Sequence, residues 1–378
     1  MDFELTSEQQ EKQFEFKAFV DQWVVPHADE FDRQERIPDE VIQELGKKGW
    51  LGAVVPREYG GMDMPAITFG LLCEEFGRGS GSLISILTVH GMVCQAISKW
   101  GTDQQKQHWL PKLATGEELG AFALTEPNIG SDATNVETEA VHSEGLFTLT
   151  GHKKWISFGQ KATLFLVVAQ CEGAPTSFLM ERNTPGFSTE PITGLLGFRA
   201  AMLAKLRLEK CRIPEKNLLG RIGSGFKYVA GTALDHGRYC VGWACVGAAK
   251  ACLDACLLYS SRRKQFGVPL KEHQLIQQMI TKMIANTKAA KMLCLQAGWL
   301  KEKGEPRVIM ETSIAKYFAS RVAFKIAADA VQIHGANGCG SGFPVQRYLR
   351  DAKICEIIEG STQIQQMIIS SFGNHLKV

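Results

Sequence analysis

The chain has 378 residues, of which 45% are hydrophobic and 22% are charged, a balance typical of a globular protein with room for two or three domains. Its formal net charge of +2, without any run of five basic residues, argues against a nucleic-acid-binding protein or a polybasic membrane anchor. The acidic, polar N-terminus and the absence of a long uncharged apolar window predict a cytoplasmic protein without a membrane span. The eleven cysteines include no CxxC pair, so we expect buried thiols and no metal site.

Residues 1–119 have the hydrophobic period and punctuation of helices. Thr6 and Gln9 have the spacing of a capping box, Pro38 is placed to start a helix, and Asp103 is predicted to cap another. This block is therefore predicted to be an all-α N-terminal domain.

The hydrophobic period changes twice along the rest of the chain. Residues 120–224 alternate with a period near two, which predicts a β-domain, and residues 225–378 return to helical periodicity. The predicted strands include 146–151, 163–170, 176–181 and 204–213. The predicted helices are 225–262, 272–303, 307–334 and one after Gly360. The fold class is α+β multi-domain: an N-terminal helical domain, a β-barrel or sandwich-like middle domain and a C-terminal four-helix bundle.

Nucleotide-binding signatures of other classes are missing. Strands and helices do not alternate as a Rossmann domain requires, and the glycine cluster at 338–342 does not have GxGxxG spacing. The phosphate-binding GK[ST] motif is also absent from the sequence. A nicotinamide-binding domain and an NTPase are thus disfavoured.

The segment FALTEPNIGSD, residues 122–132, predicts a strand that runs into a ligand-binding turn. Asn128 and Gly130 can adopt a positive φ, and Ser131 offers an amide and a hydroxyl. Such a turn can hold the edge of a ring and a phosphate.

Six segments in order resemble the acyl-CoA dehydrogenase family, whose members are flavoenzymes with a helical domain, a β-domain and a four-helix bundle. They are FALTEPNIGSD (122–132), HKKWISFG (152–159), SRRKQFG (261–267), EHQLIQ (272–277), QIHGANG (332–338) and RDAKICEIIEGSTQIQ (350–365). The resemblance covers nearly the whole chain and implies a noncovalent FAD and an acyl-thioester substrate.

The resemblance implies which middle-domain residues contact FAD. Leu124 and Thr125 would contact the flavin ring, Ser131 the pyrophosphate and the substrate side of the site, and Trp155 with Ser157 the other edge of the ring. Phe122 and Gly130 are assigned to the same cofactor site. Without the resemblance, Trp155 fits a core aromatic residue at the end of a strand.

A second group of residues would reach the FAD of a neighbouring subunit, which implies a homodimer or homotetramer. Arg suits this role because its guanidinium binds pyrophosphate bidentately, although Arg263 could also be a cation at a helix C-terminus. The chain departs from the family at Ala336, where a second glycine is common. The residues of this group are Arg263, Phe266, Gln274, Gln332 and Ala336, while Ser361 and Gln363 would complete the site around the same FAD.

Glu359 lies between Ile357-Ile358 and Gly360, and it matches the catalytic base of the family. A desolvated carboxylate has a raised pKa, which suits abstraction of the substrate Cα proton while a hydride leaves Cβ for flavin N5. The alternative is a carboxylate at a helix N-terminus. Arg238 would lie near Glu359 and the thioester as a substrate-binding residue, the alternative being a salt bridge to Asp235 or to another acid of the helical bundle.

The chain looks closest to the acyl-carrier-protein dehydrogenases that make hydroxymalonyl or aminomalonyl extender units for polyketides. This likeness leaves open whether the thioester is carried by CoA or by an acyl carrier protein. An electron-transfer flavoprotein is the expected electron acceptor. The alternatives are a flavin-dependent oxidase or monooxygenase on the same fold, and a non-catalytic helical binding protein.

Overall fold

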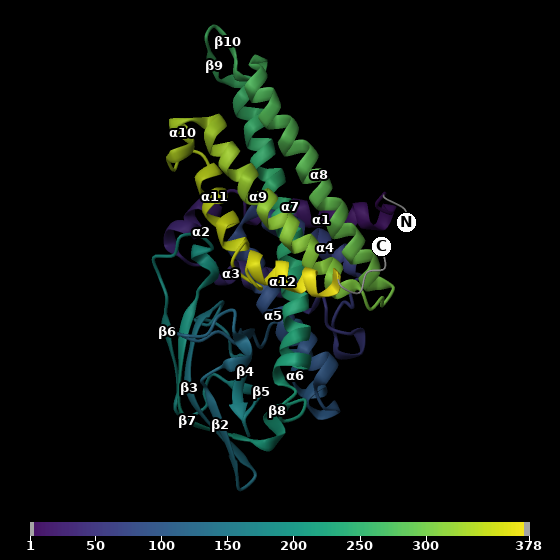
Figure 1. Ribbon diagram of the computed structural model, residues 1–378, viewed down its shortest axis with the longest axis vertical. Coiled ribbons are helices and arrows are strands. Elements are labelled where there is room, and N and C mark those ends of the chain that lie inside the picture. The colour runs from purple at the N-terminus through teal and green to yellow at the C-terminus, as the bar shows by residue number, and fades with distance from the viewer. Residues whose placement is uncertain (1–3, 374–378) are drawn as a thin grey trace.

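The computed structural model describes residues 4–373 and has the predicted order of helical, β and helical domains (Figure 1). In the N-terminal domain the capping box of Thr6 and Gln9 is confirmed. The predicted cap at Asp103 is wrong by one residue, because the Thr102 side chain accepts the backbone N–H of Gln105 and caps the helix instead. The helices of this domain are α1 (Ser7–Trp23), α2 (Ala28–Gln34), α3 (Asp39–Lys47), α4 (Ala66–Gly79), α5 (Gly81–Trp100) and α6 (Asp103–Thr115).

The middle domain is built on a mixed sheet in the order β6-β7-β3-β2-β4-β5-β8, with β1 pairing parallel to β4. Its strands are β1 (Gly120–Ala123), β2 (Glu139–Ser143), β3 (Leu146–Ile156), β4 (Leu164–Cys171), β5 (Ala174–Glu181), β6 (Phe187–Pro191), β7 (Ala204–Pro214) and β8 (Leu218–Leu219).

Alternation along β1 and β4 separates two cores. Leu164 and Leu166 of β4 pack into the core shared with the helices, whereas Phe165 and Val167 pack inside the β-domain. Strand β4 is buried on both faces for this reason, since neighbouring side chains point to opposite sides of a strand. Phe122 of β1 likewise faces the helical domains, where the cavity described below lies.

The C-terminal domain contains three long helices that extend away from the β-domain (Figure 1). A π-helical turn at Gly225–Ala230 leads into the first of them. A small hairpin, β9 (Lys264–Gln265) and β10 (Val268–Pro269), stands at their far tip. The helices are α7 (Gly231–Arg262), α8 (Gln274–Glu302), α9 (Val308–His334), α10 (Ala336–Cys339), α11 (Val345–Cys355) and α12 (Thr362–Gly373).

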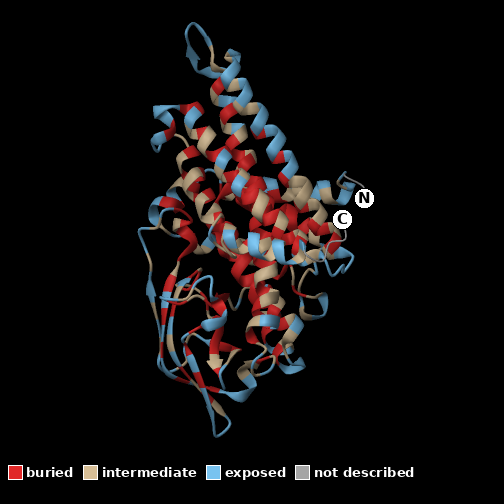
Figure 2. Ribbon diagram, in the orientation of Figure 1, coloured by how far each residue is buried: buried red, intermediate tan, exposed pale blue. Residues whose placement is uncertain are grey.

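Two helical stretches, Gly81–Trp100 and Gly225–Arg262, are long and apolar enough to cross a membrane by length and composition. Neither stretch is an unbroken run of apolar residues, because the first contains Ser85, Thr88 and Gln95 and the second contains Lys250 and Asp254. Both stretches are mostly buried within the protein, and Figure 2 shows the buried residues concentrated in the middle of the helical domains. Their apolar character is accounted for by packing in the core.

Candidate active site

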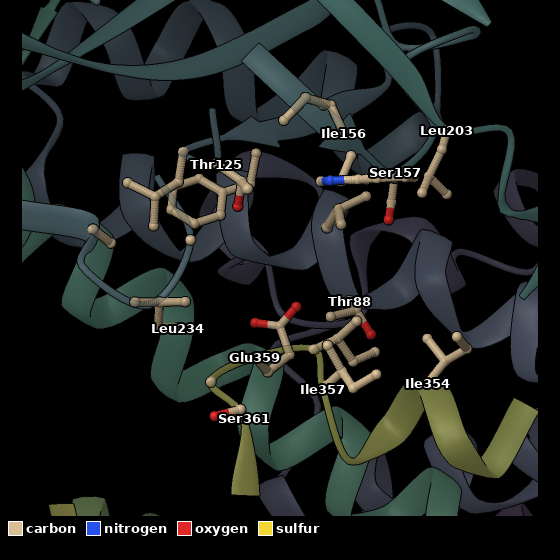
Figure 3. Close-up of a pocket in the computed structure, with 18 of the residues that line it drawn as sticks. Thr88, Thr125, Ile156, Ser157, Leu203, Leu234, Ile354, Ile357, Glu359 and Ser361 are labelled. Carbon is tan, nitrogen blue, oxygen red and sulfur yellow. The ribbon is translucent and has the colours of Figure 1, made fainter. Parts of the chain in front are cut away.

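A cavity of about 700 Å³ lies between the β-domain, helices α5 and α7, and the loop that joins α11 to α12 (Figure 3). Most of the residues predicted from the sequence line it, and they come from the β-domain, from α7 and from the loop before α12. These residues are Phe122, Leu124, Thr125, Gly130, Ser131, Trp155, Ser157, Arg238, Glu359 and Ser361. Folding thus brings the predicted flavin loop and the predicted base to one cavity.

The other predicted site residues do not line this cavity in a single chain. Phe266 is 96% exposed in the hairpin at the tip of the helices, with its backbone at a φ of 52°. Arg263 and Gln274 lie beside that hairpin, at the end of α7 and the start of α8. The predicted residues outside the cavity, all exposed, are Arg263, Phe266, Gln274, Gln332, Ala336 and Gln363.

Trp155 is the exposed aromatic residue in the β-domain wall of the cavity. It is 48% exposed, has a φ of 62°, and its ring centroid lies 4.8 Å from the Nζ of Lys154. The alternative of a core aromatic residue is therefore wrong. A positive φ is a strained backbone conformation for a bulky residue, and such conformations cluster at functional sites.

A buried ion pair braces the loop that follows β1. The Nζ of Lys153 lies 2.6 Å from the Glu126 carboxylate, and neither side chain is exposed. Lys153 also donates to the Leu124 carbonyl, and Glu126 accepts from the backbone N–H of Thr138. Burial lowers the pKa of Lys153 to about 8, although Glu126 opposes this. The pair holds the loop on the cavity wall. It could not be predicted from the sequence, because neither Lys153 nor Glu126 differs there from an ordinary surface charge.

Glu359 forms the opposite wall, in the loop between α11 and α12. Its carboxylate points into the cavity, with Thr125 and Ser157 on the facing side (Figure 3). Its Oε2 is buried and, within the described residues, has no hydrogen-bond partner. Helix α12 begins at Thr362, after Glu359, and the Oε2 of Glu359 accepts no bond from its amides, which favours the base over the alternative of a helix N-terminal carboxylate.

Arg238 supports the loop rather than the carboxylate. Its Nε donates to the Glu359 carbonyl at 3.3 Å. The alternative salt bridge to Asp235 is wrong, because Asp235 pairs with Lys301 of α8. Arg238 and Glu359 therefore meet at the cavity, as predicted from the resemblance.

The electrostatic environment of Glu359 suits a base near neutral pH. Burial raises the pKa of Glu359 to about 7, and the positive charges of Arg238 and Lys316 oppose part of that rise. A base with such a pKa is about half ionised near neutral pH. General-base catalysis is most effective when the pKa of the base lies near the operating pH.

A catalytic base at Glu359 would make the pH dependence of the reaction follow the ionisation of this carboxylate. Because only the ionised carboxylate accepts a proton, we expect kcat/KM for flavin reduction to rise about tenfold per pH unit below 7 and to level off above it.

The effect of Glu359 on the free energy of unfolding has the opposite pH dependence. The raised pKa favours the protonated folded form, so this contribution is present below the ordinary value of 4.5 and is lost as pH rises through 7. Chemical denaturation of the wild type and Glu359→Gln across this range checks the second effect.

The chain belongs to the acyl-CoA dehydrogenase family. The N-terminal, middle and C-terminal domains of the family match residues 6–117, 121–211 and 223–372 of this chain, respectively. The protein is accordingly an oxidoreductase of the acyl-CoA dehydrogenase type, and the cofactor indicated by this membership is FAD. The family, fold class and cofactor predicted from the sequence are confirmed.

Similar proteins include CoA and carrier-protein enzymes. The probable acyl-CoA dehydrogenase YngJ of Bacillus subtilis (strain 168) is 36% identical, over 98% of this chain and 99% of its own. Butyryl-CoA dehydrogenase from Megasphaera elsdenii is 34% identical with a TM-score of 0.94, over 98% of this chain and 99% of its own. The prolyl acyl carrier protein oxidase AnaB is 27% identical with a TM-score of 0.93, over 98% of this chain and 99% of its own.

Proposed function

We propose that the protein is an FAD-dependent acyl-thioester dehydrogenase in which Glu359 removes the Cα proton of the substrate. The observation that carries this proposal is the buried, unpartnered Oε2 of Glu359, aimed into a cavity whose other wall is the predicted flavin loop. A buried carboxylate without a partner costs free energy, and its retention at such a position favours a chemical role.

The cavity residues fit FAD. Leu124 and Trp155 offer apolar and aromatic surface for a ring, and Gly130 leaves open space beside the loop that contains Ser131. Bound there, FAD would supply the acceptor for the hydride that leaves Cβ. The protein's own part is to place the thioester between this wall and Glu359.

The Glu359 loop also offers a donor for the thioester oxygen. Within the described chain, the backbone N–H of Glu359 has no hydrogen-bond partner, whereas the N–H of Ile358 donates to Ile354. A free amide beside the base could donate to the oxygen that gains negative charge as the proton leaves. Arg238 would keep this loop in place through the Glu359 carbonyl.

The proposal is tested by the spectrum and reactivity of the purified protein. We expect a yellow protein whose flavin is bleached under anaerobic conditions by a thioester of the correct acyl group. A preparation that cannot take up FAD, or whose flavin no thioester in a broad CoA and carrier-protein panel reduces, would refute it. Reoxidation of the bleached protein in air, compared with reoxidation by an electron-transfer flavoprotein, distinguishes the proposed dehydrogenase from an oxidase.

We further propose that the thioester is presented by an acyl carrier protein, in the manner of a polyketide extender-unit pathway. The similarity to AnaB supports this substrate class. Lys99 and Lys227 lie over the rings of Trp100 and Tyr228, which contact each other. Tyr228 is close in the chain to Phe226, which lines the cavity. Such cations would attract an acidic carrier surface.

A carrier substrate predicts a salt-dependent reaction. Raising the ionic strength, or the substitution Lys227→Glu, should lower kcat/KM for the carrier-bound thioester by about tenfold or more, because both weaken the attraction between surfaces. The matching CoA thioester should be a poorer substrate. Equal kcat/KM for the two forms at every salt concentration would count against the carrier.

We propose that a second subunit completes the FAD site. The exposed group at the tip of α7 and α8 includes Arg263, Phe266 and Gln274, and these residues lie outside the cavity of their own chain. The substitution Arg263→Ala should weaken FAD binding about 10- to 100-fold, because it removes a charge-assisted contact to pyrophosphate. Flavin retention on gel filtration measures this. The matched control is Arg262→Ala, which removes the neighbouring exposed guanidinium and should keep its FAD.

A further inference from the structure

Lys316 is a fully buried cation without an acidic partner. Its side chain is 0% exposed in the middle of α9, and no carboxylate of the described chain forms an ion pair with it. Its Nζ instead donates to the carbonyl of Gly360 at 2.8 Å. Burial lowers the pKa of this ammonium group. Burial of a lysine side chain costs folding free energy unless an acidic group pairs with it. The burial of Lys316 with only a loop carbonyl as its partner therefore requires an explanation.

The loop that Lys316 contacts has an unusual backbone. Glu359 and Gly360 have φ values of 57° and 89°, so two consecutive residues are left-handed, the first of them not glycine. Gln365 donates to both of their carbonyls at 3.0 Å, and Arg238 donates to that of Glu359. With Lys316, three side chains from three helices bind the two carbonyls of this turn.

None of these three side chains bonds to the carboxylate itself. The Glu359 Oε2 is left without a partner and remains available to the substrate. The donors therefore act on the backbone around the base and leave the base free. Strained turns of this kind persist where the surrounding structure holds them.

We propose that Lys316 is a positioning residue for the base: its buried ammonium group clamps the Gly360 carbonyl and holds the Glu359–Gly360 turn so that the carboxylate faces the substrate. This inference rests on the proposed role of Glu359. It extends that role to a side chain that does not touch the cavity and that the sequence analysis did not single out.

The charge of Lys316 gives the proposal a second, separable consequence. The titratable groups that face Glu359 are Arg238, His236 and Cys240 of α7 and Lys316 of α9. Lys316 itself also faces the thiols of Cys245 and Cys355. Removal of this one cation should raise the pKa of Glu359, because less positive charge then favours the ionised carboxylate.

The test compares Lys316→Met with wild type in the FAD-loaded enzyme. Methionine preserves most of the buried volume but has neither a charge nor a donor. We expect flavin reduction to slow by about 10- to 100-fold at neutral pH, because the base is misplaced. The acid limb of the pH profile should move up by about one unit. Without substrate, hydrogen exchange of the segment 356–363 should become faster than in wild type.

The matched control is Lys291→Met, which removes a partly buried lysine of the same helical domain. Lys291 pairs with the buried Glu74 and does not line the cavity, so its loss should lower stability while the pH profile stays unchanged. Lys316→Gln keeps a neutral donor, and it should show the same pH shift with a smaller loss of rate.

Several outcomes would overturn the proposal. One is a Lys316→Met enzyme with the wild-type rate, pH profile and exchange; another is a Lys291→Met enzyme with the same pH shift. If Lys316→Met does not fold, Lys316→Gln decides by the same measurements, and failure of both variants to fold would show that Lys316 serves the fold instead. If Glu359→Gln keeps full activity, the base is misassigned; if it is inactive while Lys316→Met is normal, only this inference fails.

Discussion

The Glu359→Gln variant should bind FAD normally and lose at least about two orders of magnitude in the rate of substrate-driven flavin reduction. Glutamine keeps the shape of the side chain but cannot accept the Cα proton, and loss of a general base typically costs about 10²- to 10⁴-fold. Anaerobic rapid mixing with a reactive thioester measures the rate. The fold should persist, because the Oε2 of Glu359 has no partner to lose.

The matched control for this variant is Glu356→Gln. Glu356 lies in the same loop and pairs with Lys353 at 2.8 Å, and it does not line the cavity. Its substitution should leave flavin reduction nearly unchanged. If Glu359→Gln bleached its flavin at the wild-type rate, the base would lie elsewhere, with Glu356 and Asp235 as the next candidates.

Gly237→Ala should also disable the reaction, through packing against the base. A Cβ at this position would lie 2.3 Å from the Glu359 Oε2 and 2.3 Å from the Met92 Cε, so the carboxylate or the methionine must move. A displacement of the base by about 1 Å can cost about 100-fold in rate. We therefore expect flavin reduction to fall about 10- to 100-fold while FAD remains bound.

Gly242→Ala provides the control on the same helix. A Cβ there would meet its nearest neighbours, the Lys316 N and the Cys294 Sγ, at 3.5 and 3.6 Å, which are ordinary contacts. This variant should keep its rate and be as stable as wild type or somewhat more so, because alanine favours a helix by up to about 1 kcal/mol over glycine. Equal activity of the two variants would show that Gly237 does not make room for the base.

The helix α11 shows how a local signal can be missed. Val345, Tyr348, Ala352 and Cys355 are buried and repeat with helical spacing, so periodicity alone could have predicted this helix. Residues 350–365 were instead assigned to a motif of the family, which hid the helical period. In contrast, no pattern in the sequence pairs Lys153 with Glu126, because two charged residues far apart along the chain carry no mark of their contact.

The order of the three domains, the family and the candidate base can all be predicted from the sequence. These depend on local periodicity and on short motifs, which neighbours along the chain specify. The contacts that bring Leu124, Arg238 and Glu359 to one cavity, and the Lys316 Nζ to the Gly360 carbonyl, join segments far apart in the sequence and appear only in the folded chain. The pKa of Glu359 is likewise a tertiary property: burial by segments distant in sequence removes water from the carboxylate, and the Ile-Ile flank alone cannot do so.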